Sequence, residues 1–107
     1  MQEFIDYEGR VIILSDESER HLAQEHIEVP RIGLAAVLRG TLADPDVVIA
    51  SRRDSRGALY YRLRSEDPFA GKYVCVVVKY LENESYIWTA YVTSRIRDGR
   101  VIWTREQ

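Results

Sequence analysis

Three hydroxyl side chains recur at every second position late in the chain, at Thr89, Tyr91 and Thr93. Because side chains alternate between the two faces of a β-strand, a strand here would place all three on one face. The two histidines, His21 and His26, lie in the first third of the chain. An imidazole has an unperturbed pKa of about 6.5, so it exchanges protons readily near neutral pH. Together these residue types suit the binding of a phosphodiester and proton transfer at a ribose.

Arginine side chains concentrate in the remainder of the chain. Residues 1–40 hold eight acidic and four basic side chains, whereas residues 41–107 hold nine acidic and eleven basic ones, within a net charge of −2. The arginines form two groups, Arg52, Arg53, Arg56, Arg62 and Arg64, and then Arg95, Arg97, Arg100 and Arg105. A guanidinium keeps its charge and donates paired hydrogen bonds to phosphate. These arginines are therefore candidate phosphate ligands, or else they line a solvated sheet face and pair with carboxylates.

Metal-free RNA cleavage needs proton-transfer groups such as imidazoles and cations such as guanidinium groups. A base takes the proton of the ribose 2′-hydroxyl, which attacks the phosphorus and yields a 2′,3′-cyclic phosphate, while an acid protonates the leaving 5′-oxygen. His21 and His26 are five residues apart, about 140° around a helix, so both can face one site only if the helix ends first. If the helix continues, at most one of them is catalytic. The alternative to a catalytic role is that His21 is a partly buried helix residue bonded to a backbone carbonyl and that His26 is a C-terminal helix residue that interacts with the dipole.

The elements that must position these groups can be predicted from sequence patterns. Residues 4–14 favour a hairpin with its turn at Glu8-Gly9, followed by a helix that Asp16 caps and that ends near Glu25 or His26. A second helix is expected from Pro30 to Gly40. Strands are expected at residues 47–50, 58–64, 73–80, 86–96 and 101–103, the last two joined by an Asp98-Gly99 hairpin turn. This order predicts an α+β domain with the hairpin and both helices packed on one face of a mainly antiparallel sheet.

Length and composition limit the classes of protein to which this chain can belong. The 107 residues suit one domain that spans 1–107, and the longest apolar run, residues 73–78, is far shorter than the roughly 20 residues of a membrane-spanning helix. No secretory signal is visible at the start, which favours a cytoplasmic protein. Cys75 lies among valines and is expected to be buried. Trp88 and Trp103 are expected to belong to the core rather than to serve as base-stacking platforms. His21 and Glu25 lack a third ligand, so we expect neither a metal site nor a cofactor.

The chain resembles the small bacterial and phage proteins that are grouped with the barnase, EndoU, colicin and RelE-like nucleases, and in particular their phage-type branch. The resemblance is carried by residues 16–22 with His26, residues 42–48, Tyr60-Tyr61-Arg62, residues 76–79 and Thr89-Ala90-Tyr91. The chain departs from the family pattern after His26, where Glu28-Val29-Pro30 stands in place of a His-Pro-Glu-like sequence. The resemblance implies metal-free cleavage of RNA, often by a toxin that a cognate antitoxin protein inhibits.

The residues and the resemblance together define a candidate site. We expect catalytic roles for His21, Arg62, Thr89 and Tyr91. We expect substrate contacts from His26, Arg56, Tyr60, Arg64 and Thr93. The leading hypothesis is a toxin-type, metal-independent endoribonuclease whose substrate is RNA. The alternative is a catalytically silent module of the same fold that binds RNA or a protein, and a metal-dependent nuclease is a third reading. Thr89 and Thr93 can also be explained as good strand formers.

Overall fold

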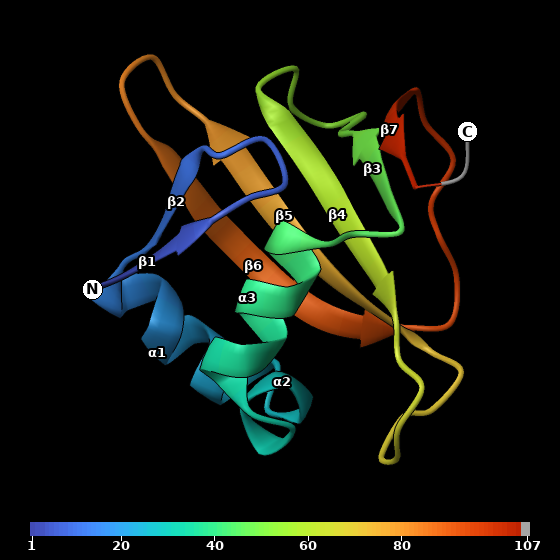
Figure 1. The fold of residues 1–107 in the computed structure, drawn as a ribbon. Helices are drawn as coiled ribbons and strands as arrows, with labels where there is room; N and C mark the ends of the chain where they lie inside the picture. The colour runs from blue at the N-terminus through green and yellow to red at the C-terminus, as the bar shows by residue number, and fades with distance from the viewer. Residues whose placement is uncertain (106–107) are drawn as a thin grey trace.

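The computed structural model describes residues 1–105, and this part of the chain forms three helices and one seven-stranded sheet (Figure 1). The strands are β1 (Gln2–Ile5), β2 (Val11–Leu14), β3 (Val47–Ala50), β4 (Gly57–Leu63), β5 (Tyr73–Tyr80), β6 (Ser85–Thr93) and β7 (Val101–Thr104). The helices are α1 (Asp16–Glu25), α2 (Glu28–Arg31) and α3 (Leu34–Ala43). The strand order is β1-β2-β6-β5-β4-β3-β7, and only β2 and β6 pair in parallel. The predicted α+β class with a mainly antiparallel sheet is confirmed.

The N-terminal hairpin forms as predicted, but the start of the first helix differs in detail. Ser15, rather than Asp16, is the N-cap residue, and its hydroxyl accepts a hydrogen bond of 3.1 Å from the backbone N–H of Ser18. Asp16 is the first residue of α1, where a negative charge interacts favourably with the helix dipole. The helix ends at Glu25, so the condition for bringing both histidines to one site is met.

The single helix predicted from Pro30 to Gly40 is instead two helices. Gly33 separates α2 from α3 and has a φ of +98°, a left-handed conformation that glycine adopts without steric cost. A helix cannot continue through such a residue, so α3 starts afresh at Leu34 and runs on to Ala43. The prediction placed the glycine inside a helix because the apolar pattern continues across it.

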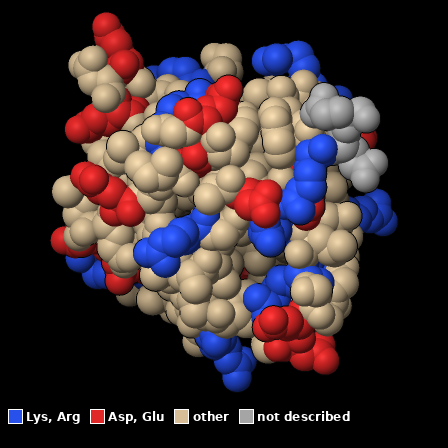
Figure 2. Space-filling view, in the orientation of Figure 1, with Lys and Arg blue, Asp and Glu red and all other residues tan. Residues whose placement is uncertain are grey.

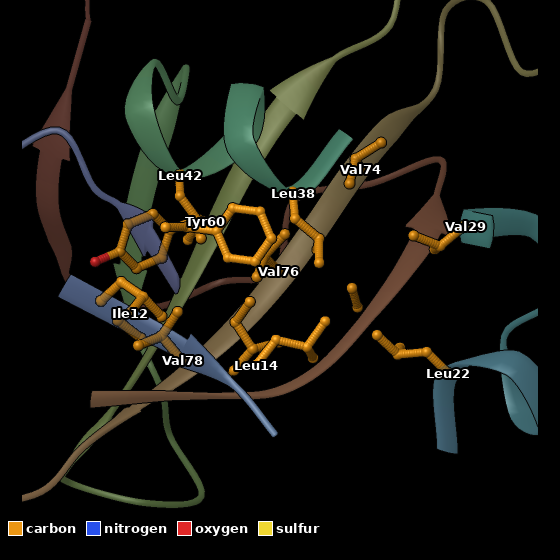
Figure 3. Close-up of a cluster of buried hydrophobic side chains, with 14 of the residues drawn as sticks. Ile12, Leu14, Leu22, Val29, Leu38, Leu42, Tyr60, Val74, Val76 and Val78 are labelled. Atoms are coloured by element: carbon orange, nitrogen blue, oxygen red, sulfur yellow. The ribbon is translucent and has the colours of Figure 1, made fainter. Parts of the chain in front are cut away.

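The helices cover one face of the sheet and enclose the main hydrophobic core (Figures 1 and 3). Leu38 and Leu42 from α3 meet Val76 and Tyr60 from the central strands, and all four side chains are fully buried. Figure 3 also shows Ile12 and Leu14 of β2 reaching into the same cluster. This packing uses alternate residues of each strand and leaves the other alternate residues for the opposite face of the sheet.

The predicted hairpin between the last two strands does not form. β6 already has β5 on one side and β2 on the other, so the chain crosses the sheet after Thr93 and β7 pairs antiparallel with β3. Gly99 lies on this crossing, where a Cβ atom would come within 2.5 Å of the Ile49 side chain. The Asp98-Gly99 pair therefore permits a close approach to β3 instead of making a hairpin turn. No helix among residues 1–105 is long and apolar enough to cross a membrane.

Candidate active site

A cleft of about 520 Å³ lies on the sheet face that the helices leave uncovered. Its floor consists of Leu59, Val77 and Thr89, which lie side by side in the register of β4, β5 and β6. The loop between β3 and β4 and the crossing segment after β6 form its walls. These walls contribute the charged residues Arg52, Arg53, Asp54, Arg97 and Asp98.

A β-bulge changes which residues reach this cleft. Val77 is paired with Thr89, whereas its neighbour Val78 is paired with Ile87, so Trp88 is an extra residue in β6. Trp88 consequently leaves the core face, lines the cleft and is 61% exposed. The Lys79 ammonium lies 4.5 Å from the centre of its ring. The prediction that Trp88 belongs to the core is therefore wrong, because simple alternation does not reveal a bulge.

Tyr91 lies at the end of a row of polar side chains that crosses the sheet through Cys75 to Tyr61. Burial raises the pKa of the Tyr91 phenol, and the nearby positive charge of Arg97 offsets part of that effect. Burial also raises the pKa of the Cys75 thiol to about 11 and that of Tyr61 to about 12. Tyr91 thus remains protonated at neutral pH, which makes it a hydrogen-bond donor rather than a base, and Cys75 is an unreactive thiol.

The two histidines gather beside Tyr91 because α1 ends at Glu25. The ring centre of His26 lies 5.9 Å from that of His21 and 5.9 Å from that of Tyr91. His26 is partly buried and His21 is exposed. The two imidazoles do not line the cleft themselves, but Tyr91 connects them to it.

A carboxylate lies close to His26, beside β6. Oε2 of Glu28 lies 3.9 Å from Nδ1 of His26 and accepts a hydrogen bond of 3.3 Å from the backbone N–H of Val92. A carboxylate beside one imidazole nitrogen orients the ring and leaves the other nitrogen for proton transfer. Glu28 is therefore a candidate positioning residue, at the position where the sequence departs from the family pattern.

The cations around the cleft differ in how they are paired. Asp54 lies 2.9 Å from the Lys79 ammonium and 3.4 Å from Nε of Arg56. A hydrogen bond from the Arg56 backbone, together with Lys79, lowers the pKa of Asp54 to about 2. Among residues 1–105, the side chains of Arg52, Arg53 and Arg97 make no ion pair. These three guanidinium groups are therefore available to an anionic ligand.

Three predicted site residues lie away from the cleft. Tyr60 is fully buried on the helix side, where its hydroxyl donates to Asp6 at 2.8 Å, so it cannot stack on a base. Arg62 lies on the same side and is paired with Asp44 at 2.8 Å. Nε of Arg64 donates to the carbonyl oxygen of Pro68 at 2.9 Å, beyond the end of β4. The alternation along β4 that groups Tyr60, Arg62 and Arg64 turns all three away from Tyr91.

The helix side also differs from the cleft in its charge pattern. Figure 2 shows this side, and its acidic and basic side chains are interspersed rather than grouped by sign. Asp44 illustrates the pairing there, since it contacts both Arg62 and Arg105 at 2.8 Å. The cleft instead combines four cationic side chains, those of Arg52, Arg53, Lys79 and Arg97, with two carboxylates, those of Asp54 and Asp98.

The remaining predicted residues lie in or near the cleft. Thr89 lines it, although its hydroxyl oxygen is buried and has no hydrogen-bond partner within the described residues. Thr93 follows Tyr91 on the same face, and its hydroxyl lies 3.4 Å from the backbone nitrogen of Arg95. Arg56 lies near the rim through its contact with Asp54. The sequence pattern included Arg97 only as one of several candidate phosphate ligands. It assigned no site role to Lys79, Trp88 or Glu28.

Comparison with known proteins assigns the chain to a family. Residues 2–104 match the family described as phage-Barnase-EndoU-ColicinE5/D-RelE like nuclease2. The chain belongs to this nuclease family. The resemblance noted in the sequence is thereby confirmed. No curated protein and no solved structure matches the chain. Within residues 1–105, no group of three or more histidine, cysteine, aspartate or glutamate side chains is arranged to hold a metal ion.

Proposed function

We propose that this member of the nuclease family is a metal-independent endoribonuclease that cleaves RNA through a 2′,3′-cyclic phosphate, and that the cleft beside Tyr91 is its active site. The observation that supports this most strongly is the meeting of three groups. The protonated phenol of Tyr91 and the guanidinium of Arg97, which makes no ion pair within residues 1–105, line one cleft, and the imidazole of His26 lies beside it with its ring centre 5.9 Å from that of the phenol. These are the groups that an RNA 2′-hydroxyl attack requires.

The proposed roles follow from the position of each group. His26 and His21 exchange protons with the 2′-hydroxyl and the leaving 5′-oxygen, and Glu28 orients His26. Tyr91 donates a hydrogen bond to a phosphate oxygen, because the raised pKa keeps its proton in place. Arg97 stabilises the negative charge that develops on the phosphoryl oxygens in the transition state. The Thr89 hydroxyl joins them only if it turns into the cleft.

We further propose that the enzyme acts as a toxin in the cytoplasm and that a cognate antitoxin protein inhibits it. The resemblance to toxin-type nucleases supports this part of the proposal. Induced expression of the intact chain in bacteria is expected to arrest growth, and His26→Ala is expected to relieve the arrest. Normal growth with abundant, folded wild-type protein would contradict the toxin assignment.

A cleavage assay with the purified protein tests the enzymatic assignment. Single-stranded RNA is incubated with wild type, His26→Ala and His21→Ala proteins, with and without EDTA, and the ends of the products are analysed. We expect 2′,3′-cyclic phosphate ends, unchanged cleavage in EDTA, and strong loss of cleavage in the His26 variant.

Other outcomes identify the alternatives. Loss of wild-type cleavage in EDTA would favour a metal-dependent nuclease. RNA binding without any cleavage would favour a catalytically silent module of the same fold. Circular dichroism of each variant shows whether a loss of cleavage reflects chemistry or unfolding.

A further inference from the structure

Trp88 is placed where a large aromatic side chain is not needed for folding. The β-bulge in β6 turns its indole out of the core, and 61% of the residue is exposed at the mouth of the cleft. A single exposed apolar residue is ordinary on a protein surface. Trp88 differs because it borders a cleft and because Lys79 lies against its ring, 4.5 Å from the centre.

The neighbourhood of Trp88 combines an open aromatic surface with positive charge. Lys79 is fixed by Asp54 at 2.9 Å, and this ion pair holds the ammonium on the indole. Arg52, Arg53 and Arg97, which make no ion pair with any residue from 1 to 105, line the same cleft. An aromatic platform next to a row of cations is the combination that binds single-stranded nucleic acid, since bases stack on the ring and phosphates meet the cations.

We infer that Trp88 is the stacking platform for an unpaired nucleobase of single-stranded RNA, next to the phosphate that is cleaved. This inference rests on the proposed function and specifies its substrate as a single strand. In a duplex, neighbouring bases cover both faces of each base, so no face is available to the indole. The floor of the cleft carries Leu59 and Val77, apolar side chains that also suit the flat surface of a base.

Intrinsic fluorescence provides a direct measurement, because the chain has only two tryptophans. Trp103 belongs to the helix side, where it is partly buried and its ring centre lies 4.9 Å from that of Tyr7. A Trp103→Phe variant therefore reports on Trp88 alone, and a Trp88→Phe variant reports on Trp103 alone as the matched control. The ligand is a single-stranded 2′-O-methyl oligoribonucleotide, which cannot be cleaved because its 2′-oxygen is blocked.

We expect saturable quenching by this oligonucleotide in the Trp103→Phe protein and no quenching in the Trp88→Phe protein. The same oligonucleotide annealed to its complement is expected to quench weakly. In a separate anisotropy assay with a labelled oligonucleotide, Trp88→Ala is expected to raise Kd at least about 5-fold, which is the lower end of the effect of one stacked base.

Two contrary results have different meanings. If the labelled oligonucleotide binds while Trp88 fluorescence stays constant, or if Trp88→Ala leaves Kd unchanged, the stacking platform is refuted and the cleft remains a candidate active site. If the labelled single strand does not bind and RNA is not cleaved, the proposed function fails together with this inference. Equal affinity for the single strand and the duplex would refute the substrate assignment.

Discussion

Replacement of Thr89 by valine should make the protein more stable and less active. The hydroxyl oxygen of Thr89 is buried and has no hydrogen-bond partner within the described residues. A buried polar group without a partner costs about 1–3 kcal/mol, and valine has nearly the same shape and an equal preference for strands. We therefore expect the free energy of unfolding of Thr89→Val to rise by about 1 kcal/mol, which corresponds to a gain of about 4 °C in Tm for a domain of this size.

The activity of the same variant tests whether this hydroxyl is retained for function. A hydrogen bond to a charged phosphate contributes about 1.5–3 kcal/mol, so its loss should reduce kcat/KM for RNA roughly 10- to 100-fold. Urea denaturation and RNA cleavage are measured on one preparation. Thr93→Val is the matched control, since the Thr93 hydroxyl contacts the Arg95 backbone and its removal should lower stability by no more than about 0.5 kcal/mol.

The result that would refute this reasoning is a Thr89→Val protein that is less stable than wild type. Such a loss would mean that the hydroxyl has a partner in solution and that burial does not destabilise it. Stabilisation with full activity would remove Thr89 from the site while leaving the energetic argument intact.

Three further predictions concern charge and burial. Arg97→Ala should reduce cleavage of RNA and lower the salt dependence of RNA binding, whereas Arg62→Ala, on the other face of the sheet, should change neither. RNA cleavage, and RNA binding across a salt series, are measured for both variants. Because burial raises the pKa of Tyr61 from 10.0 to about 12, the unfolded chain loses this proton first, so this tyrosine should lower the free energy of unfolding by about 2 kcal/mol as the pH rises from 10 to 12. In Tyr61→Phe the free energy of unfolding should fall less over the same pH range, as measured by urea denaturation. An equal fall in the variant and the wild type would contradict the prediction. Asp6→Asn should destabilise the fold by about 3 kcal/mol, because the fully buried carboxylate accepts bonds from Arg10 and Tyr60 that an amide cannot all replace; an unchanged urea midpoint would contradict this.

Local sequence patterns were sufficient to predict most of the helices and strands. The strand predicted at residues 73–80 is β5 to the residue, and that at 47–50 is β3, because both are short β-branched runs bounded by turn residues. The alternation in residues 58–64 and 86–96 also located β4 and β6, with ends shifted by one to three residues. The helix after Pro30 was less accurate, since an apolar pattern does not show that Gly33 takes a positive φ.

The site was predicted only in part. Alternation correctly placed Thr89 and Tyr91 on one face of β6, and it also implied that Tyr60, Arg62 and Arg64 share a face of β4. It could not show that these two faces are opposite sides of one sheet, because that depends on the pairing register through β5. Arg97 reaches the cleft only because the chain crosses the sheet to pair β7 with β3, a long-range pairing that no local signal encodes.

The amino-acid sequence by itself therefore determined the family, the α+β class and the chemical groups available for catalysis, since these follow from residue types and short-range periodicity. The tertiary structure alone decided which of those groups meet. The end of α1 brings His26 to Tyr91, the bulge in β6 exposes Trp88, and the crossing after β6 brings Arg97 over the sheet. Each of these features either joins residues that are far apart in the chain or depends on a shift of one residue in strand register. Local sequence preferences determine neither long-range contacts nor register.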